Sequence, residues 1–283
     1  MKQYDNRAWL LLLPAIMLLG IVGALPLLTV INYGFHDIFS LENVHWIGTQ
    51  WFYDIVTSPS FHASFARSLL FSTLALAIQV PLGIAIALGL LPLGKHAVWG
   101  LMLCALPLVV PWNMIPVMWL SLIGDGGLLG PLGTATGFDY RFTPLHTWVL
   151  ILVVDTWHWL GLVVILSYAG FSAIPPAYRQ AAAIDGASRL AVFRHIELPR
   201  IAGALMIVLL LRFVDSFMIY TEAFAINAGG PNDATRFLSI ELGEEIKGFS
   251  YGQAAARASL YFMIVLSLVW AFVSITRRQG GAA

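Results

Sequence analysis

The chain has 283 residues, of which 59% are hydrophobic and 11% are charged, and its mean hydropathy is +0.82. These values exclude an ordinary water-soluble fold, and the net charge of zero excludes the strong overall basic field of a nucleic-acid-binding protein. The single cysteine, Cys104, excludes a disulfide or a thiolate metal site within the chain. We expect Cys104 to pack as a small apolar residue.

Six apolar stretches are long enough to cross a bilayer as helices. They are residues 8–33, 66–92, 97–123, 145–171, 201–226 and 251–276. The first stretch is too long for a signal peptide, so we expect it to be retained. The sequence therefore predicts an all-α polytopic transmembrane helical bundle that forms a single domain over residues 1–283.

The third stretch contains Pro107, Pro111 and Pro116. Proline inside a membrane helix removes a backbone hydrogen bond, which neighbouring helices or cavity water must replace. We therefore predict that this stretch is bent and lines a cavity. Simple packing kinks are the alternative interpretation.

Lysine and arginine are distributed unevenly among the connecting segments. If the N-terminus is cytoplasmic, the inner segments carry nine of them: Lys2, Arg7, Lys95, Arg179, Arg189, Arg194, Arg200, Arg277 and Arg278. The outer segments then carry three: Arg141, Arg236 and Lys247. The positive-inside rule therefore predicts a multi-pass membrane protein with both termini in the cytoplasm.

The longest inner segment, residues 174–200, is predicted to form two short helices with a break between them. The Pro175–Pro176 pair suits a first helical turn, and Gly186 can adopt the left-handed conformation that ends a helix. Ser188 is a suitable N-cap for the second helix. Pro199 is expected to stop that helix before the next crossing.

The same segment resembles the EAA loop of permease subunits in bacterial ABC importers. That pattern reads E-A-A, three residues, G, nine residues and then I-x-L-P. The residues that match it or stand at its positions are Gln180, Ala181, Ala182, Asp185, Gly186, Ala187, Ile196, Leu198 and Pro199. Gln180 replaces the usual glutamate and keeps its length and an acceptor oxygen but not its charge. In the resembled family this loop docks on a cytoplasmic ATPase subunit.

Four further segments are similar to the carbohydrate-importing branch of that family, the maltose and glycerol-phosphate type. They read TWHWLG, SFMIYTEAF, AGGP and YGQAAA, and the likeness extends from about Trp9 to Arg277. It implies a type I importer permease fold and ATP-driven import of a sugar, polyol or glycerol derivative. It also implies a second homologous permease, two ATPase subunits that bind ATP and Mg, and a periplasmic solute-binding protein.

The chain contains no P-loop motif for ATP, so we expect neither an ATPase site nor a cofactor or metal of its own. Energy would come from the partner ATPase and reach the crossings through residues 174–200. Alternating access to the two sides of the membrane is the mechanism that the resemblance implies.

Ionisable residues inside membrane crossings are costly and are functional candidates by default. Asp215 and Arg212 are three residues apart and could simply pair on one helix face. Glu222 matches an acidic position common in the resembled family. Sugars combine hydroxyls with C–H faces, which carboxylates and aromatic rings recognise. The predicted substrate-pathway residues are Trp112, Asn113, Asp155, Trp157, His158, Trp159, Asp215, Phe217, Tyr220 and Glu222.

Other interpretations of these residues stay open. The tryptophans are also typical of interfacial belts, and His158 could be a hydrogen-bonded packing residue. The carboxylates also admit an ion-coupled secondary transporter, although such proteins often show paired repeats that this sequence lacks. A scaffold that only recruits a partner is a third possibility. The solute is undetermined, and a phosphorylated one would favour Arg67, Arg212 or Arg257 as its anion partner.

Overall fold

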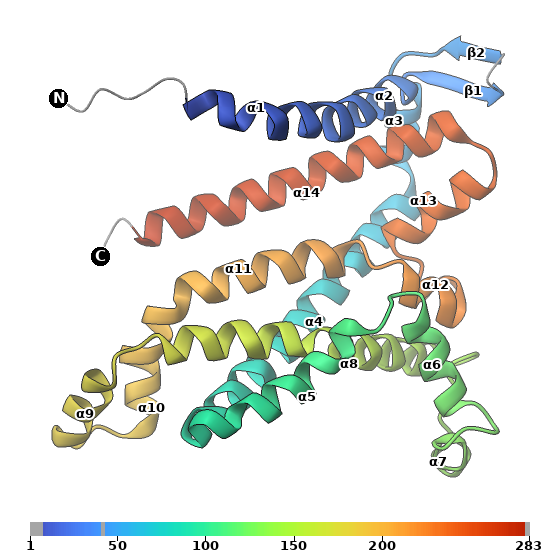
Figure 1. Cartoon of the computed structure of the whole chain (residues 1–283). Coiled ribbons are helices and arrows are strands. Elements are labelled where there is room, and N and C mark those ends of the chain that lie inside the picture. The colour runs from blue at the N-terminus through green and yellow to red at the C-terminus, as the bar shows by residue number, and fades with distance from the viewer. Residues whose placement is uncertain (1–7, 41–42, 281–283) are drawn as a thin grey trace. The chain divides into compact units, whose positions relative to one another are not determined.

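The structure is a computed structural model that describes residues 8–40 and 43–280 (Figure 1). Lys2 and Arg7, which contribute to the predicted orientation, lie outside these residues, as do the side chains of Arg277 and Arg278. The described residues are mainly helical, with one antiparallel hairpin in which His36 pairs with Trp46. The predicted all-α class is confirmed.

The elements follow one another along the chain as shown in Figure 1. The helices are α1 (Ala8–Leu19), α2 (Leu25–Tyr33), α3 (Gln50–Thr57), α4 (Pro59–Leu90), α5 (Ala97–Val109), α6 (Met114–Ile123), α7 (Gly130–Thr136), α8 (Pro144–Ser172), α9 (Pro176–Ile184), α10 (Arg189–Val192), α11 (Leu198–Phe217), α12 (Thr221–Asn227), α13 (Leu238–Lys247) and α14 (Tyr251–Gly280). The strands are β1 (His36–Ser40) and β2 (Asn43–Trp46). Gly20–Ala24 and Phe193–Glu197 are π-helical, and Leu91–His96 is a 3-10 helix.

Within the described residues, five apolar helical stretches reach the length of a membrane crossing. They are Leu10–Tyr33, Pro59–Val109, Pro144–Ser172, Arg189–Asn227 and Tyr251–Ser274. The second has 51 residues, which as one helix would be about 77 Å long, against a hydrocarbon core of about 30 Å. It breaks at Gly94, whose φ of 53° and ψ of −124° are readily available only to glycine. This stretch therefore contains the second predicted crossing and the first half of the third, whose second half is the shorter apolar helix Met114–Ile123.

The third predicted crossing is bent, as its prolines predicted. Helix α5 ends at Val109, and α6 begins at Met114. Between them Val110 is extended, with φ −69° and ψ 129°. The residue before a proline is driven toward this conformation by a clash with the proline ring, and Pro111 follows Val110. Pro111 therefore accounts for the position of the bend.

The fifth predicted crossing, residues 201–226, is not the continuous helix that we expected. Helix α11 ends at Phe217, and α12 begins only at Thr221. Near this end the Ser216 hydroxyl donates to the Arg212 carbonyl at 2.7 Å, a bond that competes with helical geometry. The Ile219 carbonyl, inside the interruption, accepts a hydrogen bond from the Ser239 hydroxyl. A distant side chain thus satisfies backbone that the break leaves unpaired.

Contacts divide the chain into two compact units, each built from segments distant in sequence. One comprises residues 1–62 and 241–267, and the other comprises residues 63–240 and 268–283. The prediction of a single permease domain stays a prediction. All the substrate-pathway and coupling residues predicted above belong to the second unit.

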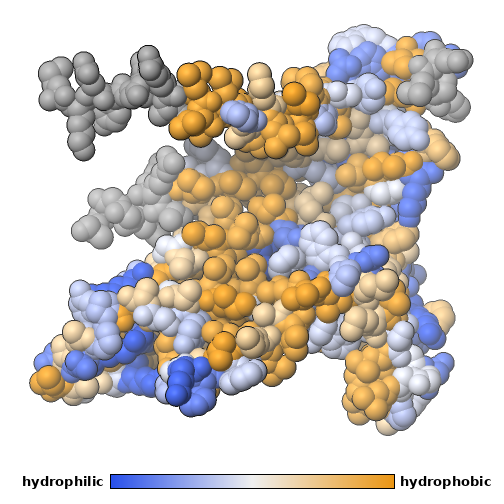
Figure 2. Space-filling view, viewed as in Figure 1, coloured by the Kyte–Doolittle hydropathy of each residue, from blue (hydrophilic) through white to orange (hydrophobic). Residues whose placement is uncertain are grey.

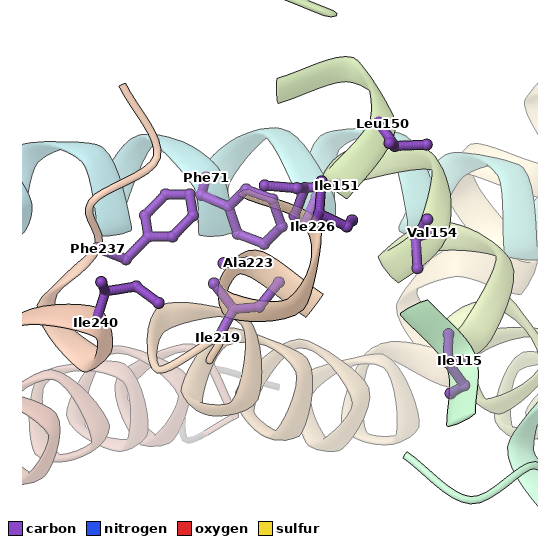
Figure 3. Close-up of a cluster of buried hydrophobic side chains, with 11 residues drawn as sticks. Phe71, Ile115, Leu150, Ile151, Val154, Ile219, Ala223, Ile226, Phe237 and Ile240 are labelled. Carbon is purple, nitrogen blue, oxygen red and sulfur yellow. The ribbon is translucent and has the colours of Figure 1, made fainter. Parts of the chain in front are cut away.

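The second unit is held by a buried apolar cluster to which α4, α6, α8, α12 and α13 contribute (Figure 3). Its members are Phe71, Ala75, Ile115, Leu150, Ile151, Val154, Ile219, Ala223, Ile226, Phe237 and Ile240. Helix α8 also packs closely on α5, because a Cβ added to Gly161 would lie 1.9 Å from the Cys104 carbonyl oxygen. Cys104 itself is half-buried. Such small-residue contacts are how helices approach one another in lipid.

Surface chemistry agrees with membrane insertion. Apolar side chains cover the exposed face of α1, whereas hydrophilic ones gather over α9 and α10 (Figure 2). Leu11 in α1 is 83% exposed. Such an apolar surface has no stable place in water and is normal against lipid tails.

Candidate functional site

Helices α4, α8 and α11 meet at a buried ion-pair network centred on Arg212. The Arg212 Nη2 donates to Asp155 Oδ2 at 2.8 Å, and its Nε donates to Gln79 Oε1 at 2.9 Å. Its Nη1 donates to Asp215 Oδ2, which confirms the predicted pairing on one helix face. Gln79 Nε2 also donates to Asp155 Oδ2, at 2.6 Å. The side chains of Arg212 and Asp155 are only 1% and 2% exposed, so pairing is what makes their burial tolerable.

An aromatic ring completes the environment of the guanidinium. The Arg212 Cζ lies 4.6 Å from the centroid of the Trp159 ring, within the range of a cation–π interaction. Trp159 and Asp155 are four residues apart on α8, so one helix face presents both to Arg212.

Glu222 and His158 form a second pair next to this network. His158 Nδ1 lies 3.8 Å from Glu222 Oε1, and both side chains are buried. That separation is too long for a hydrogen bond, and His158 Nδ1 has no partner among the described residues. The interpretation of His158 as a hydrogen-bonded packing residue therefore does not hold for this nitrogen. Glu222 lies in the first turn of α12, where the helix dipole stabilises a carboxylate.

A cavity of about 130 Å³ opens where the breaks in the third and fifth predicted crossings meet. It is lined by Trp112, Asp155, Trp159, Asp215, Met218, Ile219, Tyr220, Thr221 and Glu222. Six of the ten predicted substrate-pathway residues are in this lining. Interrupted helices at membrane depth are tolerated where they line such a cavity. The role of these six residues in transport stays a prediction.

The other four predicted residues are not in the lining. Trp157 packs on Trp119, with ring centroids 5.8 Å apart, and Phe217 is buried against other phenylalanines. Each lies two residues after a lining carboxylate, which turns it about 200° around its helix. Asn113 is exposed, and His158 is buried beside Glu222.

Sequence reasoning missed Gln79. It is fully buried in α4 and contributes both a donor and an acceptor to the network. A lone amide within the apolar stretch 66–92 was the available signal, because an uncompensated amide in lipid is costly.

A second buried cluster lies in the unit that contains residues 241–267. Arg257 Nη1 donates to Glu241 Oε2 at 2.6 Å and to the Tyr261 hydroxyl at 3.3 Å. Its Nη2 lies 2.6 Å from Glu245 Oε1, and the Ser60 hydroxyl donates to Glu241. Burial raises the pKa of Glu245 above its usual value, although Arg257 opposes this effect.

The predicted coupling segment begins as the sequence indicated. Helix α9 starts at Pro176, and Gly186 has a φ of 67° just after it ends. The Ser188 Oγ accepts a hydrogen bond from the Ala191 backbone N–H at 3.3 Å, which confirms Ser188 as the N-cap of α10. Both short helices and the break between them are therefore present.

Pro199 does not stop the second helix, so that prediction was wrong. The chain continues from α10 through the π-helical residues Phe193–Glu197 into α11. There the Leu198 backbone N–H donates to the carbonyl of Phe193, five residues back. This wide turn places Pro199 in the first turn of α11, where its missing N–H and fixed φ are tolerated.

Side-chain contacts join the coupling segment to the C-terminal end of α8 and to the N-terminal end of α11. Arg179 Nε donates to Glu197 Oε1 at 2.6 Å, and its Nη2 donates to the Phe171 carbonyl at 3.1 Å. The Arg200 guanidinium lies 3.7 Å from the centroid of the Tyr178 ring. Of the motif residues, Ala182 is buried, Ile196 and Leu198 are partly buried, and the others are exposed: Gln180, Ala181, Asp185, Gly186, Ala187 and Pro199.

Comparison with known proteins assigns the chain to a protein family. Residues 79–279 match the family described as binding-protein-dependent transport system inner membrane component, which is more than two thirds of the chain. The chain belongs to this family. This inner membrane component is therefore the multi-pass permease of a binding-protein-dependent ABC importer, and the family that the sequence resembles is confirmed. As such a component it has no ATPase activity of its own and binds no cofactor, since ATP is used by an ATPase of the importer.

Relatives of this inner membrane component extend over nearly its whole length. It is 25% identical over 275 residues to the trehalose/maltose transport system permease protein MalF of Thermococcus litoralis, covering 95% of this chain and 93% of that protein. It is 27% identical to the diacetylchitobiose uptake system permease protein DasB of Streptomyces coelicolor, covering 96% and 87%. Both relatives are named for carbohydrates.

The fold of the inner membrane component is that of a solved importer. A chain in the crystal structure of a bacterial ABC transporter involved in the import of the acidic polysaccharide alginate superposes with a TM-score of 0.82. The two are 21% identical, and the match covers 96% of each. This confirms the type I importer permease fold. In a second structure of an alginate transporter, a periplasmic protein carries an alginate pentasaccharide.

Proposed function

We propose that this permease carries a carbohydrate, namely a sugar, polyol or glycerol derivative, through the cavity between α8, α11 and α12. The observation that supports this most is the cavity's combination of carboxylates with aromatic rings. Asp215 and Glu222 offer hydrogen-bond acceptors for hydroxyls, and Trp112 and Tyr220 offer apolar faces for sugar C–H groups. The carbohydrate names of the relatives point the same way.

The coupling that we propose runs from an ATPase docked on residues 174–200 to the cavity. Ile184 and Leu190 are 87% and 74% exposed there, and they offer an apolar surface to the ATPase. The bonds of Arg179 to Phe171 and Glu197 connect this surface to the end of α8 and the approach to α11. These two helices carry Asp155 and Arg212, so movement of the segment reaches the cavity and alternates its access.

The proposed assembly contains this chain, a second homologous permease, two ATPase subunits with ATP and Mg, and a periplasmic binding protein. Both termini and residues 174–200 face the cytoplasm. The ion-coupled alternative loses its main motivation, because Asp155 and Asp215 are paired with Arg212.

The proposal is tested by uptake into proteoliposomes that contain the reconstituted importer and its binding protein. Radiolabelled trehalose, maltose, glucose and glycerol serve as probes, with amino acids of similar size as controls. We expect ATP-dependent uptake of at least one carbohydrate and none when the ATPase subunits are omitted. Uptake of amino acids alone would refute the carbohydrate assignment, and uptake without the ATPase would refute the coupling.

A further inference from the structure

The cavity described above carries more negative than positive charge. Its lining includes three carboxylates, Asp155, Asp215 and Glu222, and no lysine or arginine among the described residues. Arg212 is the cation bonded to this group, and its Nε, Nη1 and Nη2 already donate to Gln79, Asp215 and Asp155. With a side chain only 1% exposed, Arg212 has little capacity left for an incoming anion.

The excess of negative charge does not depend on the state of His158. Asp155 Oδ2 accepts hydrogen bonds from both Arg212 and Gln79, so these two donors are already used within the network. Three carboxylates thus face Arg212 and at most one further positive charge, that of His158 beside Glu222. The formal charge of these groups is therefore negative with His158 neutral and also with His158 protonated.

Asp215 is the most exposed of the three carboxylates in the lining. Its side chain is 32% exposed, whereas the side chains of Glu222 and Asp155 are 7% and 2% exposed. Arg212 occupies one side of Asp215 and leaves the other carboxylate oxygen without that partner. A hydroxyl or an ammonium group can donate to this oxygen, whereas a fully ionised phosphate or carboxylate group has no proton to donate.

The other arginines considered as partners for an anion are engaged elsewhere. Arg67 Nη1 donates to the Arg236 carbonyl at 3.2 Å. Arg257 is held by Glu241 and Glu245 in the other compact unit. Neither belongs to the cavity lining.

We infer that the cavity rejects anionic solutes and accepts uncharged or amine-bearing carbohydrates, and that Asp215 determines this selectivity. The inference rests on the proposed function of the cavity and narrows its substrates, since sugar phosphates and uronates are excluded. An unpaired anion beside carboxylates in a confined, poorly hydrated space is strongly repelled.

The test measures the charge preference of the cavity directly, by thiol chemistry in the assembled importer. Cys104→Ala removes the only native thiol of the chain, and Thr221→Cys places a thiol in the cavity lining. Two methanethiosulfonate reagents of similar size are compared, one bearing a trimethylammonium group and the other a sulfonate. Modification of this chain is followed by mass, and each rate is divided by that with free 2-mercaptoethanol.

We expect the cationic reagent to react at least about tenfold faster than the anionic one. Adding Asp215→Asn, which keeps the shape and one acceptor oxygen, should bring the ratio of rates several-fold closer to one. Asp233→Asn is the matched control, because it removes an exposed carboxylate outside the lining and should leave the ratio unchanged.

Three results would overturn the inference: equal rates for both reagents, a ratio unaffected by Asp215→Asn, or no reaction with either reagent, since a solute could not then reach the cavity. No ATP, binding protein or solute is used in this measurement. Its failure therefore leaves ATP-driven uptake, the test of the proposed function, to be decided separately.

Discussion

Arg212 connects three helices through its side chain alone. Its partners Gln79, Asp155 and Asp215 belong to α4, α8 and α11. Breaking a buried ion pair by removing one partner typically costs about 3–5 kcal/mol, because the other charge is left uncompensated. The effect should be strongest for Asp155, which is almost fully buried.

Arg212→Ala should therefore lower the melting temperature of the purified complex, because it leaves the buried Asp155 carboxyl without its counterion. Asp155→Asn in the same chain removes that charge and should recover part of the loss. Thermal unfolding of the two single variants and the double variant is measured, with size-exclusion chromatography as the readout of intact complex. A double variant no more stable than Arg212→Ala alone would show that the Asp155 charge is not what Arg212 stabilises.

Glu222→Ala should reduce ATP-driven uptake about tenfold or more while the amount of assembled complex changes little. The physical reason is that Glu222 lines the cavity and offers an acceptor for the solute. Uptake is measured per mole of assembled complex, and Glu244→Ala, which removes an exposed carboxylate outside the cavity, is the control. Equal losses of uptake and assembly would instead assign Glu222 a structural role.

Residue types alone were enough to find much of the lining. Charges and aromatic rings stand out against apolar stretches, and this identified Asp155, Asp215 and Glu222. It could not separate Trp159 from Trp157, because neighbouring residues in one motif point to different sides of a helix. Gln79 escaped notice because a single amide is inconspicuous beside ionisable residues.

At the scale of elements, a break in a helix could be predicted only where a residue within the break causes it. Pro111 indicated the bend after α5, and Gly186 indicated the end of α9. No glycine or proline marks residues 218–220, where the break is supported by Ser239 from the distant α13. The error at Pro199 had a similar origin, since a π-helical turn that accommodates a proline is not apparent from the sequence.

Gly186→Arg should abolish ATP-driven uptake without preventing insertion into the membrane. The φ of 67° is strained for any residue with a Cβ, by about 1–2 kcal/mol, and the long side chain would obstruct docking of the ATPase. Uptake and membrane content of the protein are measured together. Gly126→Arg is the control, because Gly126 has open space around it and belongs to the segment before α8, at the opposite end of that helix. Normal uptake by Gly186→Arg would remove the segment from the mechanism.

At the scale of the whole molecule, the predicted orientation places residues 174–200 in the cytoplasm and the segment before α8 outside. In a Cys104→Ala background, Leu190→Cys and Leu128→Cys place exposed thiols after and before α8. A membrane-impermeant maleimide added outside intact cells should label only Leu128→Cys, and permeabilised cells should label both. Labelling of Leu190→Cys in intact cells would place residues 174–200 outside, where no ATPase could bind them.

Composition predicted the membrane crossings, but it could not predict the two compact units. In one unit the chain around His36 meets the start of α14, where a Cβ on Gly252 would lie 2.0 Å from the His36 carbonyl oxygen. More than 200 residues separate these positions. No periodicity within a segment reports such a contact, because it depends on how whole helices pack.

The buried ion-pair network centred on Arg212 also constrains how the permease can move. Separating α4, α8 or α11 would leave an unpaired charged side chain in the membrane interior, which cannot solvate it. These three helices should therefore move as one rigid body. Flexing must then concentrate at the joints beside that rigid body, after Val109 and after Phe217. Both joints border the cavity, so α12 with Glu222 would shift relative to Asp155 and Asp215, which stay fixed with Arg212.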